Sequence, residues 1–190
     1  DDFLGDLILD EYATTVSGAS AAAAVIVADT AGGIVRLVTG TDDDGRSALY
    51  TSMNFTGNMN PVITARIRSN DVAAFKCEIG FTDVGTDAGA INALDTPTAT
   101  AADCTVAIFD TDATEDNWQF AGSRTSTAWS DATVDVALAA DTWTWVTVAL
   151  RRADLTTDDM EARFYLNGIL RATRRTGAIA NTVPILPWIF

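Results

Sequence analysis

Apolar and polar residues alternate along most of this chain with a period of two, the signature of strands with one buried face. Turn residues separate the alternating segments, and no helical periodicity connects them as a βαβ unit would require. We expect an all-β sandwich in one domain over residues 1–190, which is long enough for a single core. The expected strands are residues 24–28, 34–39, 48–52, 62–68, 73–81, 105–110, 118–122, 134–138, 142–152, 162–166 and 169–174. Residues 187–190 also resemble part of a strand. Residues 85–103 are expected to form a long loop of small residues.

The clearest turn signal is Asn167-Gly168, which lies between two apolar segments and favours the type I′ turn of a two-residue β-hairpin. This turn should place Leu166 opposite Ile169. Counting outward from the turn gives two faces: a core face with Phe164, Leu166 and Ile169, and an opposite face with Tyr165, Leu170 and Ala172.

Two tryptophans, Trp143 and Trp145, lie at positions i and i+2 of the preceding strand and therefore project from one side of it. The opposite side is aliphatic, and Tyr165 is expected beside the tryptophans on the next strand. Flat aromatic rings stack on sugars and anchor protein interfaces, so Trp143, Trp145 and Tyr165 are candidate ligand-binding residues. In the alternative interpretation one or both tryptophans fill a second core layer. Core or loop packing is the expectation for Trp118, Trp129 and Trp188.

The formal net charge is −14, from 26 acidic and 12 basic residues, and Lys76 is the single lysine. Binding to nucleic acid requires clustered Lys and Arg, so we expect no nucleic-acid partner. The arginines that do cluster, near 151–152 and 171–175, either form a solvated face or contact an acidic partner. No run of about 18 apolar residues is present, and we expect no membrane span.

Cys77 and Cys104 lie on apolar sides of their expected strands. We expect two buried free thiols, and a disulfide between them would require the two strands to be neighbours.

Several segments resemble a known fold family. The succession Trp143-Thr144-Trp145-Val146-Thr147-Val148, a polar turn and Arg163-Phe164-Tyr165-Leu166-Asn167-Gly168-Ile169-Leu170 resembles the late strands of concanavalin A-like (laminin G-like) jelly-roll domains. Upstream, residues 33–40, 61–68, 79–83 and 107–113 resemble the version of this fold encoded in tailed-phage genomes, so the resemblance covers nearly the whole chain.

This resemblance implies a jelly-roll sandwich of two antiparallel sheets and a structural role in a virion. The implied protein is a homo-oligomeric capsid decoration or head-fibre protein at the virion surface, which contacts capsid or other virion proteins and exposes a lectin-like surface to host glycans. The family usually ends with another strand rich in Asp and Tyr, so we expect the chain to lack a final strand or C-terminal extension. The alternative function is an extracellular carbohydrate-binding module or host-surface adhesin.

Catalysis is not expected. The chain has no histidine, which excludes Ser-His-Asp and Cys-His nucleophile activation. Glycoside hydrolysis needs two positioned carboxylates, and none of the four glutamates begins a Glu-x-Asp-x-x-Glu spacing. A glycan-cleaving enzyme is therefore a remote alternative.

No cofactor is expected, with calcium as the one candidate, because Asp-rich loops can supply its oxygen ligands. Asp110 and Asp112 leave a strand on the same side and form the better candidate site, and residues 42–44 form a second acidic tract. Both tracts are also typical of ordinary turns, where Asp side chains bond the backbone.

Overall fold

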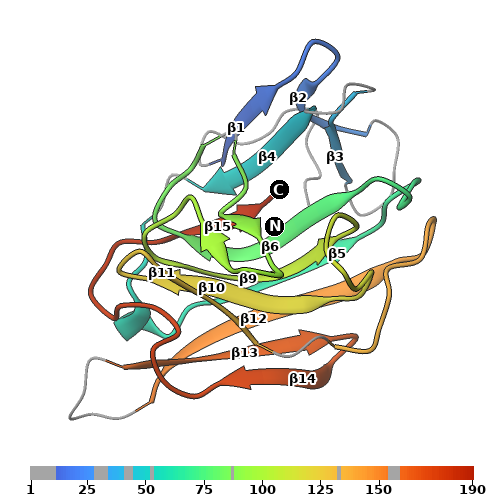
Figure 1. Cartoon of the computed structure of the whole chain (residues 1–190). Coiled ribbons are helices and arrows are strands. Elements are labelled where there is room, and N and C mark those ends of the chain that lie inside the picture. Colours follow the sequence, from blue (N-terminus) through green and yellow to red (C-terminus); the bar gives the residue numbers. More distant parts are fainter. Residues whose placement is uncertain are drawn as a thin grey trace.

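The computed structural model describes residues 12–27, 34–40, 45–51, 54–86, 88–131, 134–153 and 159–190. These residues form strands and one short 3-10 helix, η1 (Gly57–Met59). The fold is all-β, as the period-two alternation predicts, and its two large antiparallel sheets stack as the layers of a jelly-roll sandwich (Figure 1).

The larger sheet has seven strands in the order β1-β4-β15-β6-β9-β10-β11. Their bounds are β1 (Tyr12–Ser17), β4 (Arg46–Thr51), β15 (Leu186–Ile189), β6 (Lys76–Thr82), β9 (Cys104–Asp110), β10 (Gln119–Arg124) and β11 (Thr127–Asp131). All of its pairings are antiparallel. The last strand in sequence thus lies near the middle of the sheet.

The smaller sheet has four strands in the order β14-β13-β12-β5, also antiparallel. Their bounds are β14 (Ile169–Arg174), β13 (Met160–Leu166), β12 (Thr144–Arg152) and β5 (Val62–Ile67). Two further pairs of strands form sheets of their own: β2 (Ala22–Ile26) with β3 (Val35–Val38), and β7 (Ile91–Ala93) with β8 (Thr98–Ala99).

The main hydrophobic core lies between the two large sheets. The smaller sheet contributes Val146, Val148 and Leu150 from the predicted aliphatic side of β12, together with Phe164 and Leu166 from β13. These side chains are at most 1% exposed. The larger sheet contributes the apolar residues on the inner face of β6, β9, β10 and β11, including Ile79, Phe81, Phe109, Phe120 and Trp129. Trp118, Trp129 and Trp188 are buried, as predicted.

The Asn167-Gly168 hairpin has the predicted register next to its turn, with Leu166 opposite Ile169. Two of the predicted face assignments are wrong. Ile169 is 55% exposed instead of buried, because it lies at the tip of the hairpin. A β-bulge between Phe164 and Tyr165 shifts the pairing so that Phe164 faces Ala172, which packs against the core instead of lying on the Tyr165 face.

Four of the observed strands, β1, β7, β8 and β11, were not predicted as such, and one predicted strand is absent. β1 and β11 are polar and alternate weakly. β15 falls on the segment 187–190 that was expected to form a strand, although it contains Pro187, which is unfavourable inside a sheet. The pairing of β15 with β4 begins at Trp188, after the proline, so Pro187 does not need to donate a hydrogen bond there. Residues 134–138 form no strand. Two backbone hydrogen bonds nevertheless attach this segment to Trp118: the Trp118 N–H donates to the Val136 carbonyl, and the Val134 N–H donates to the Trp118 carbonyl.

The outer face of the larger sheet is also buried. Residues 85–103, predicted as a loop, contain β7 and β8, and their side chains Ile91 and Leu94 join a second hydrophobic cluster with Val106, Ile108 and Trp188. Residues 88–103, called the β7 segment below, are therefore packed against the larger sheet. In contrast, the outer face of the smaller sheet presents large side chains to solvent: Val62 (60% exposed), Trp145 (49%) and Leu170 (48%).

Cys77 and Cys104 are buried free thiols, as predicted. Their strands β6 and β9 are neighbours, which is the condition under which a disulfide was an alternative. The register keeps the two residues apart, because Cys77 faces Phe109 and Cys104 faces Thr82 at the other end of the pair. Their side chains also belong to the two different hydrophobic clusters on opposite faces of the sheet.

Candidate ligand-binding surface

The strand register brings Trp145 and Tyr165 to the outer face of the smaller sheet. Tyr165 lies directly opposite Thr147 on the neighbouring strand, and Trp145 is two residues from Thr147, so all three point to the same side. The Trp145 backbone is fixed to the hairpin turn, because its N–H donates to the Asn167 Oδ1 at 3.0 Å and its carbonyl accepts from the Asn167 N–H at 2.8 Å. The predicted grouping of these aromatic side chains on one face is therefore present.

Two arginines of β5 and its end lie against the tryptophans. Arg66 is paired directly with Trp145 across the strands, and its guanidinium carbon lies 4.7 Å from the Trp143 ring centroid and 5.8 Å from that of Trp145. Arg68 lies 5.5 Å from the Trp143 ring and 3.9 Å from the Asp141 carboxylate. Cation–π contacts of this kind hold the rings in place. Because Trp143 is partly buried and has both arginines over it, Trp145 is the more accessible ring.

The sequence reasoning missed Arg66 and Arg68 as members of this surface. Each has the same parity along residues 62–68 as the polar Thr64, so the alternation alone places them on the outer side of their strand. What it does not show is that this strand pairs with the one that carries the tryptophans.

A charged cluster occupies the same face next to Tyr165. Glu161 is 4% exposed and accepts hydrogen bonds from Arg151 (Nε at 2.8 Å and Nη2 at 3.1 Å) and from the Arg163 Nε at 2.6 Å. Burial of the Glu161 carboxyl raises its pKa, but the bonds and charges of the two arginines outweigh this and hold the pKa below its usual value. Glu161 and the Tyr165 hydroxyl raise the pKa of Arg163 in turn. The cluster contains two cations for one anion.

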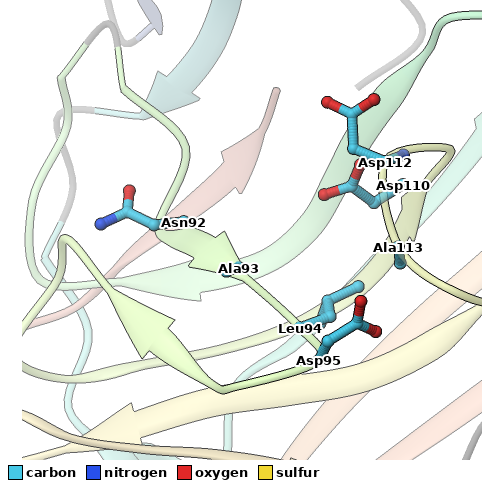
Figure 2. A pocket seen from close by; sticks show the side chains of 7 residues that line it. All are labelled: Asn92, Ala93, Leu94, Asp95, Asp110, Asp112 and Ala113. Carbon is cyan, nitrogen blue, oxygen red and sulfur yellow. Dashed lines mark hydrogen bonds between the residues drawn. The ribbon is translucent and has the colours of Figure 1, made fainter.

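Asp110 and Asp112 line a small pocket of about 90 Å³ at the end of β9. Figure 2 shows them across the pocket from Asn92 and Asp95, which belong to the β7 segment. The Asp110 Oδ2 lies 3.6 Å from the Lys76 ammonium, and the Asp110 Oδ1 accepts from the Asp112 N–H at 3.0 Å, as in an ordinary Asx turn. Within the described ranges no three acidic, His or Cys residues come together as a metal site would require. Calcium binding by Asp110 and Asp112 stays a prediction, and the acidic tract 42–44 lies outside the described residues.

Glu78 is the one fully buried glutamate among those described, and it lies beneath the β7 segment. Its carboxylate accepts from the backbone N–H groups of Ala90 (2.7 Å) and Ile91 (3.1 Å) and from the Trp188 Nε1 (3.2 Å). Burial raises its pKa, and nearby Lys76 and these donors lower it in part. The contacts attach the β7 segment to the larger sheet.

Comparisons with known proteins relate the chain to others through its fold. No protein-family model matches it, and no curated protein matches it in sequence. Among solved structures, it is similar to the carbohydrate-binding module CBM66 from Bacillus subtilis, with a TM-score of 0.53 and 13% identity over 93% of this chain and 86% of that one. Similarity to a Bacillus licheniformis beta-glucanase has a TM-score of 0.53 and 8% identity, over 100% and 82% of the chains.

A third similar structure is the carbohydrate recognition domain of Emp47p, with a TM-score of 0.53 and 6% identity over 100% of this chain and 83% of that chain. Because the sequence identities are this low, the comparisons establish the concanavalin A-like jelly-roll fold and nothing beyond the fold. Separately, no helix in the described part of the chain has the length and apolar character to cross a membrane.

Proposed function

We propose that this chain is a carbohydrate-binding module that holds sugar on the outer face of its smaller sheet. The observation that carries the proposal is Trp145, a ring that is 49% exposed on the outer face of the smaller sheet, on the interior strand β12 beside the hairpin turn. A flat indole plane on a rigid strand is suited to stacking against the C–H face of a sugar ring. Trp143, which Arg66 and Arg68 cover in part, supports this platform from the position just before β12.

Polar groups beside Trp145 are suited to bonding sugar hydroxyls. The Thr64 and Thr147 hydroxyls lie 2.9 Å apart on the exposed face and bond each other. The Tyr165 side chain is partly exposed on the next strand. Sites for small polar ligands typically combine apolar or aromatic surface with a few such groups that fix orientation.

The fold comparisons support this proposal over the virion role that the sequence resemblance implies. CBM66 is named as a carbohydrate-binding module and the Emp47p domain as a carbohydrate recognition domain. Because a fold hosts many functions, this support is by analogy and the argument depends on the surface itself. We also propose an extracellular location, where such a module meets its ligand.

The same proposal holds that the chain binds glycans without cleaving them. Its support is the condition of the described glutamates: Glu78 is enclosed under the β7 segment, and Glu161 is held by Arg151 and Arg163. Glycoside hydrolysis needs one carboxyl as acid and a second as base or nucleophile, and both of these carboxylates are already engaged in bonds within the protein. Incubation of the chain with a bound polysaccharide, followed by an assay for new reducing ends, tests this; release of sugar would contradict it.

A capsid decoration or head-fibre role is the second candidate, and its support is the succession of phage-like sequence segments. The comparisons lend no support to a viral origin, to capsid partners or to a homo-oligomer. A viral protein of this kind would copurify with particles at a copy number that matches the capsid lattice. Absence from purified particles would leave glycan binding as the remaining proposal.

The test of glycan binding is affinity electrophoresis of the full chain through gels that contain single soluble polysaccharides. We expect retardation by at least one polysaccharide, and we expect Trp145→Ala to weaken this binding by about tenfold or more, because a tryptophan in contact with the ligand commonly contributes much of the binding energy. Trp145→Phe should retain part of it.

Val16→Ala is the matched control, since Val16 is also exposed (40%) but lies on β1 of the other sheet. It should bind as the wild type does. Trp188→Ala is unsuitable because Trp188 is fully buried and its loss would perturb folding. Unchanged binding by Trp145→Ala, or no binding to any polysaccharide in the panel, would overturn the proposal.

A further inference from the structure

The charges of this chain are distributed very unevenly. The chain as a whole carries −14, with 12 basic and 26 acidic residues. Residues 62–68, 144–152 and 160–175, which contain the four strands of the smaller sheet, carry eight arginines and one acidic residue, Glu161. The smaller sheet is therefore strongly cationic on a molecule that is otherwise acidic.

We propose that the outer face of the smaller sheet binds an anionic glycan, one whose sugars carry carboxylate or sulfate groups, with Trp145 stacking on a sugar ring and Arg66 pairing with an acidic group. This inference rests on the proposed function and specifies its ligand class.

The cations are directed to the face that carries the aromatic rings. Arg66 lies opposite Trp145. Arg151 and Arg163 lie on the outer side of β12 and β13, because the residues adjacent to them in each strand, such as Leu150 and Phe164, point into the core. A sugar stacked on Trp145 would thus meet the Arg66 guanidinium in the adjacent position. A planar guanidinium can donate two parallel hydrogen bonds to a carboxylate or sulfate, which gives geometry as well as charge.

Arg66 has no acidic partner among the residues that the structure describes. Its guanidinium makes cation–π contacts with the rings of Trp143 and Trp145. Arg171 and Arg175, at the other edge of the sheet, are exposed and likewise form no ion pair within the described ranges. A guanidinium held on aromatic rings retains its N–H donors for a ligand. Arg174 differs from these three arginines, because its guanidinium already forms an ion pair with Asp131 at 3.2 Å.

The overall charge of −14 does not prevent this binding, because the Debye length at physiological salt is about 8 Å and screens the distant acidic residues. It does disfavour nucleic acid, whose continuous phosphates need many cations along an extended track. The unpaired arginines here are few and lie at separate positions on a sheet beside one exposed ring, which suits the sparser charges of an acidic polysaccharide.

The experiment compares glycans that differ only in charge. Polygalacturonate is paired with its fully methyl-esterified form, and dextran sulfate with dextran, and each is titrated into the full chain by calorimetry. We expect at least one charged member to bind about tenfold or more tightly than its neutral partner at low salt, with a difference that shrinks as salt is added. A poly(dT) oligonucleotide is included as a probe for nucleic acid.

Variants locate the effect. Arg66→Gln should lose about ten- to a hundredfold of the affinity for the charged glycan, as expected for a charge-assisted hydrogen bond, and Arg66→Lys should lose less because it keeps the charge. Arg36→Gln is the matched control: it removes the same charge from an exposed position on β3, outside the smaller sheet, and should bind as the wild type does. Urea denaturation verifies that each variant is folded.

Three results would overturn the inference. Equal binding of the charged and neutral members of both pairs would refute it while leaving the proposed function intact. No binding to any of the four polysaccharides, together with none in the gel assay, would refute both. Tighter binding of poly(dT) than of any charged glycan would replace the ligand class with single-stranded nucleic acid.

Discussion

Substitution of Glu161 by Gln tests the charged cluster beside the aromatic rings. The carboxylate accepts three hydrogen bonds from Arg151 and Arg163, at 2.6 to 3.1 Å, and glutamine keeps a single acceptor oxygen. Buried hydrogen bonds to charged groups contribute about 1.5–3 kcal/mol. The Arg151 side chain is 51% exposed, so water screens its ion pair with Glu161 and reduces the contribution of that pair to stability. We therefore expect Glu161→Gln to lower the free energy of unfolding by about 1–2 kcal/mol at neutral pH.

The pH dependence of this loss follows from the lowered pKa of Glu161. A carboxyl whose pKa is lower in the folded state stabilises the fold above its unfolded pKa, here near 4.5, and this contribution is lost as the pH falls through the folded pKa. The wild type should thus exceed Glu161→Gln in stability at pH 7, and the two should converge in acid.

Urea denaturation followed by tryptophan fluorescence at about pH 7, 5 and 3 measures the difference. Glu115→Gln is the matched control, because Glu115 is an exposed glutamate with no recorded side-chain contact, and it should change stability little at any pH. A loss for Glu161→Gln that is as large at pH 3 as at pH 7 would refute the electrostatic reasoning, since it would indicate altered packing instead. So would no loss at pH 7.

Three further predictions concern the fold. Phe164→Ala should lower the free energy of unfolding by about 3–5 kcal/mol in urea, because it opens a cavity in the core where Phe164 is fully buried; a loss below about 1 kcal/mol would contradict this. Gly80→Ala should give little soluble folded protein, since the added Cβ would lie 2.1 Å from the Thr105 carbonyl oxygen, and a wild-type melting curve would refute it. Cys77 and Cys104 should resist a thiol reagent until urea unfolds the chain, because burial raises the pKa of both; rapid labelling of the native protein would contradict their burial.

Much of the strand content follows from the alternation in the sequence, because that pattern assigns each residue of a strand to a face. It correctly indicated β12, β13 and β14 and the turn between the last two. It failed for β1 and β11, whose residues are mostly polar, and for residues 134–138, whose apolar side chains Val134 and Leu138 are buried without sheet pairing. Burial alone produces the same sequence pattern as a strand in such a segment.

The candidate surface was predictable in part. The spacing of Trp143 and Trp145 placed them on one side, and the hairpin turn placed Tyr165 relative to the core. The position of Arg66 against both rings depends on the pairing of β5 with β12, which lie almost 80 residues apart in the chain. The bulge beside Tyr165, which moves Ala172 into the core, is set by packing and has no signal in the turn.

The sequence by itself determined the all-β class, the hairpin register at Asn167-Gly168 and the aromatic side of β12, because these follow from local spacing and turn geometry. The tertiary structure alone decided which strands are neighbours. It placed β15 inside the larger sheet and covered one outer face with the β7 segment, and it left the outer face of the smaller sheet exposed with its arginines beside Trp145. Strand order depends on contacts between distant segments, and a local pattern of alternation does not encode them.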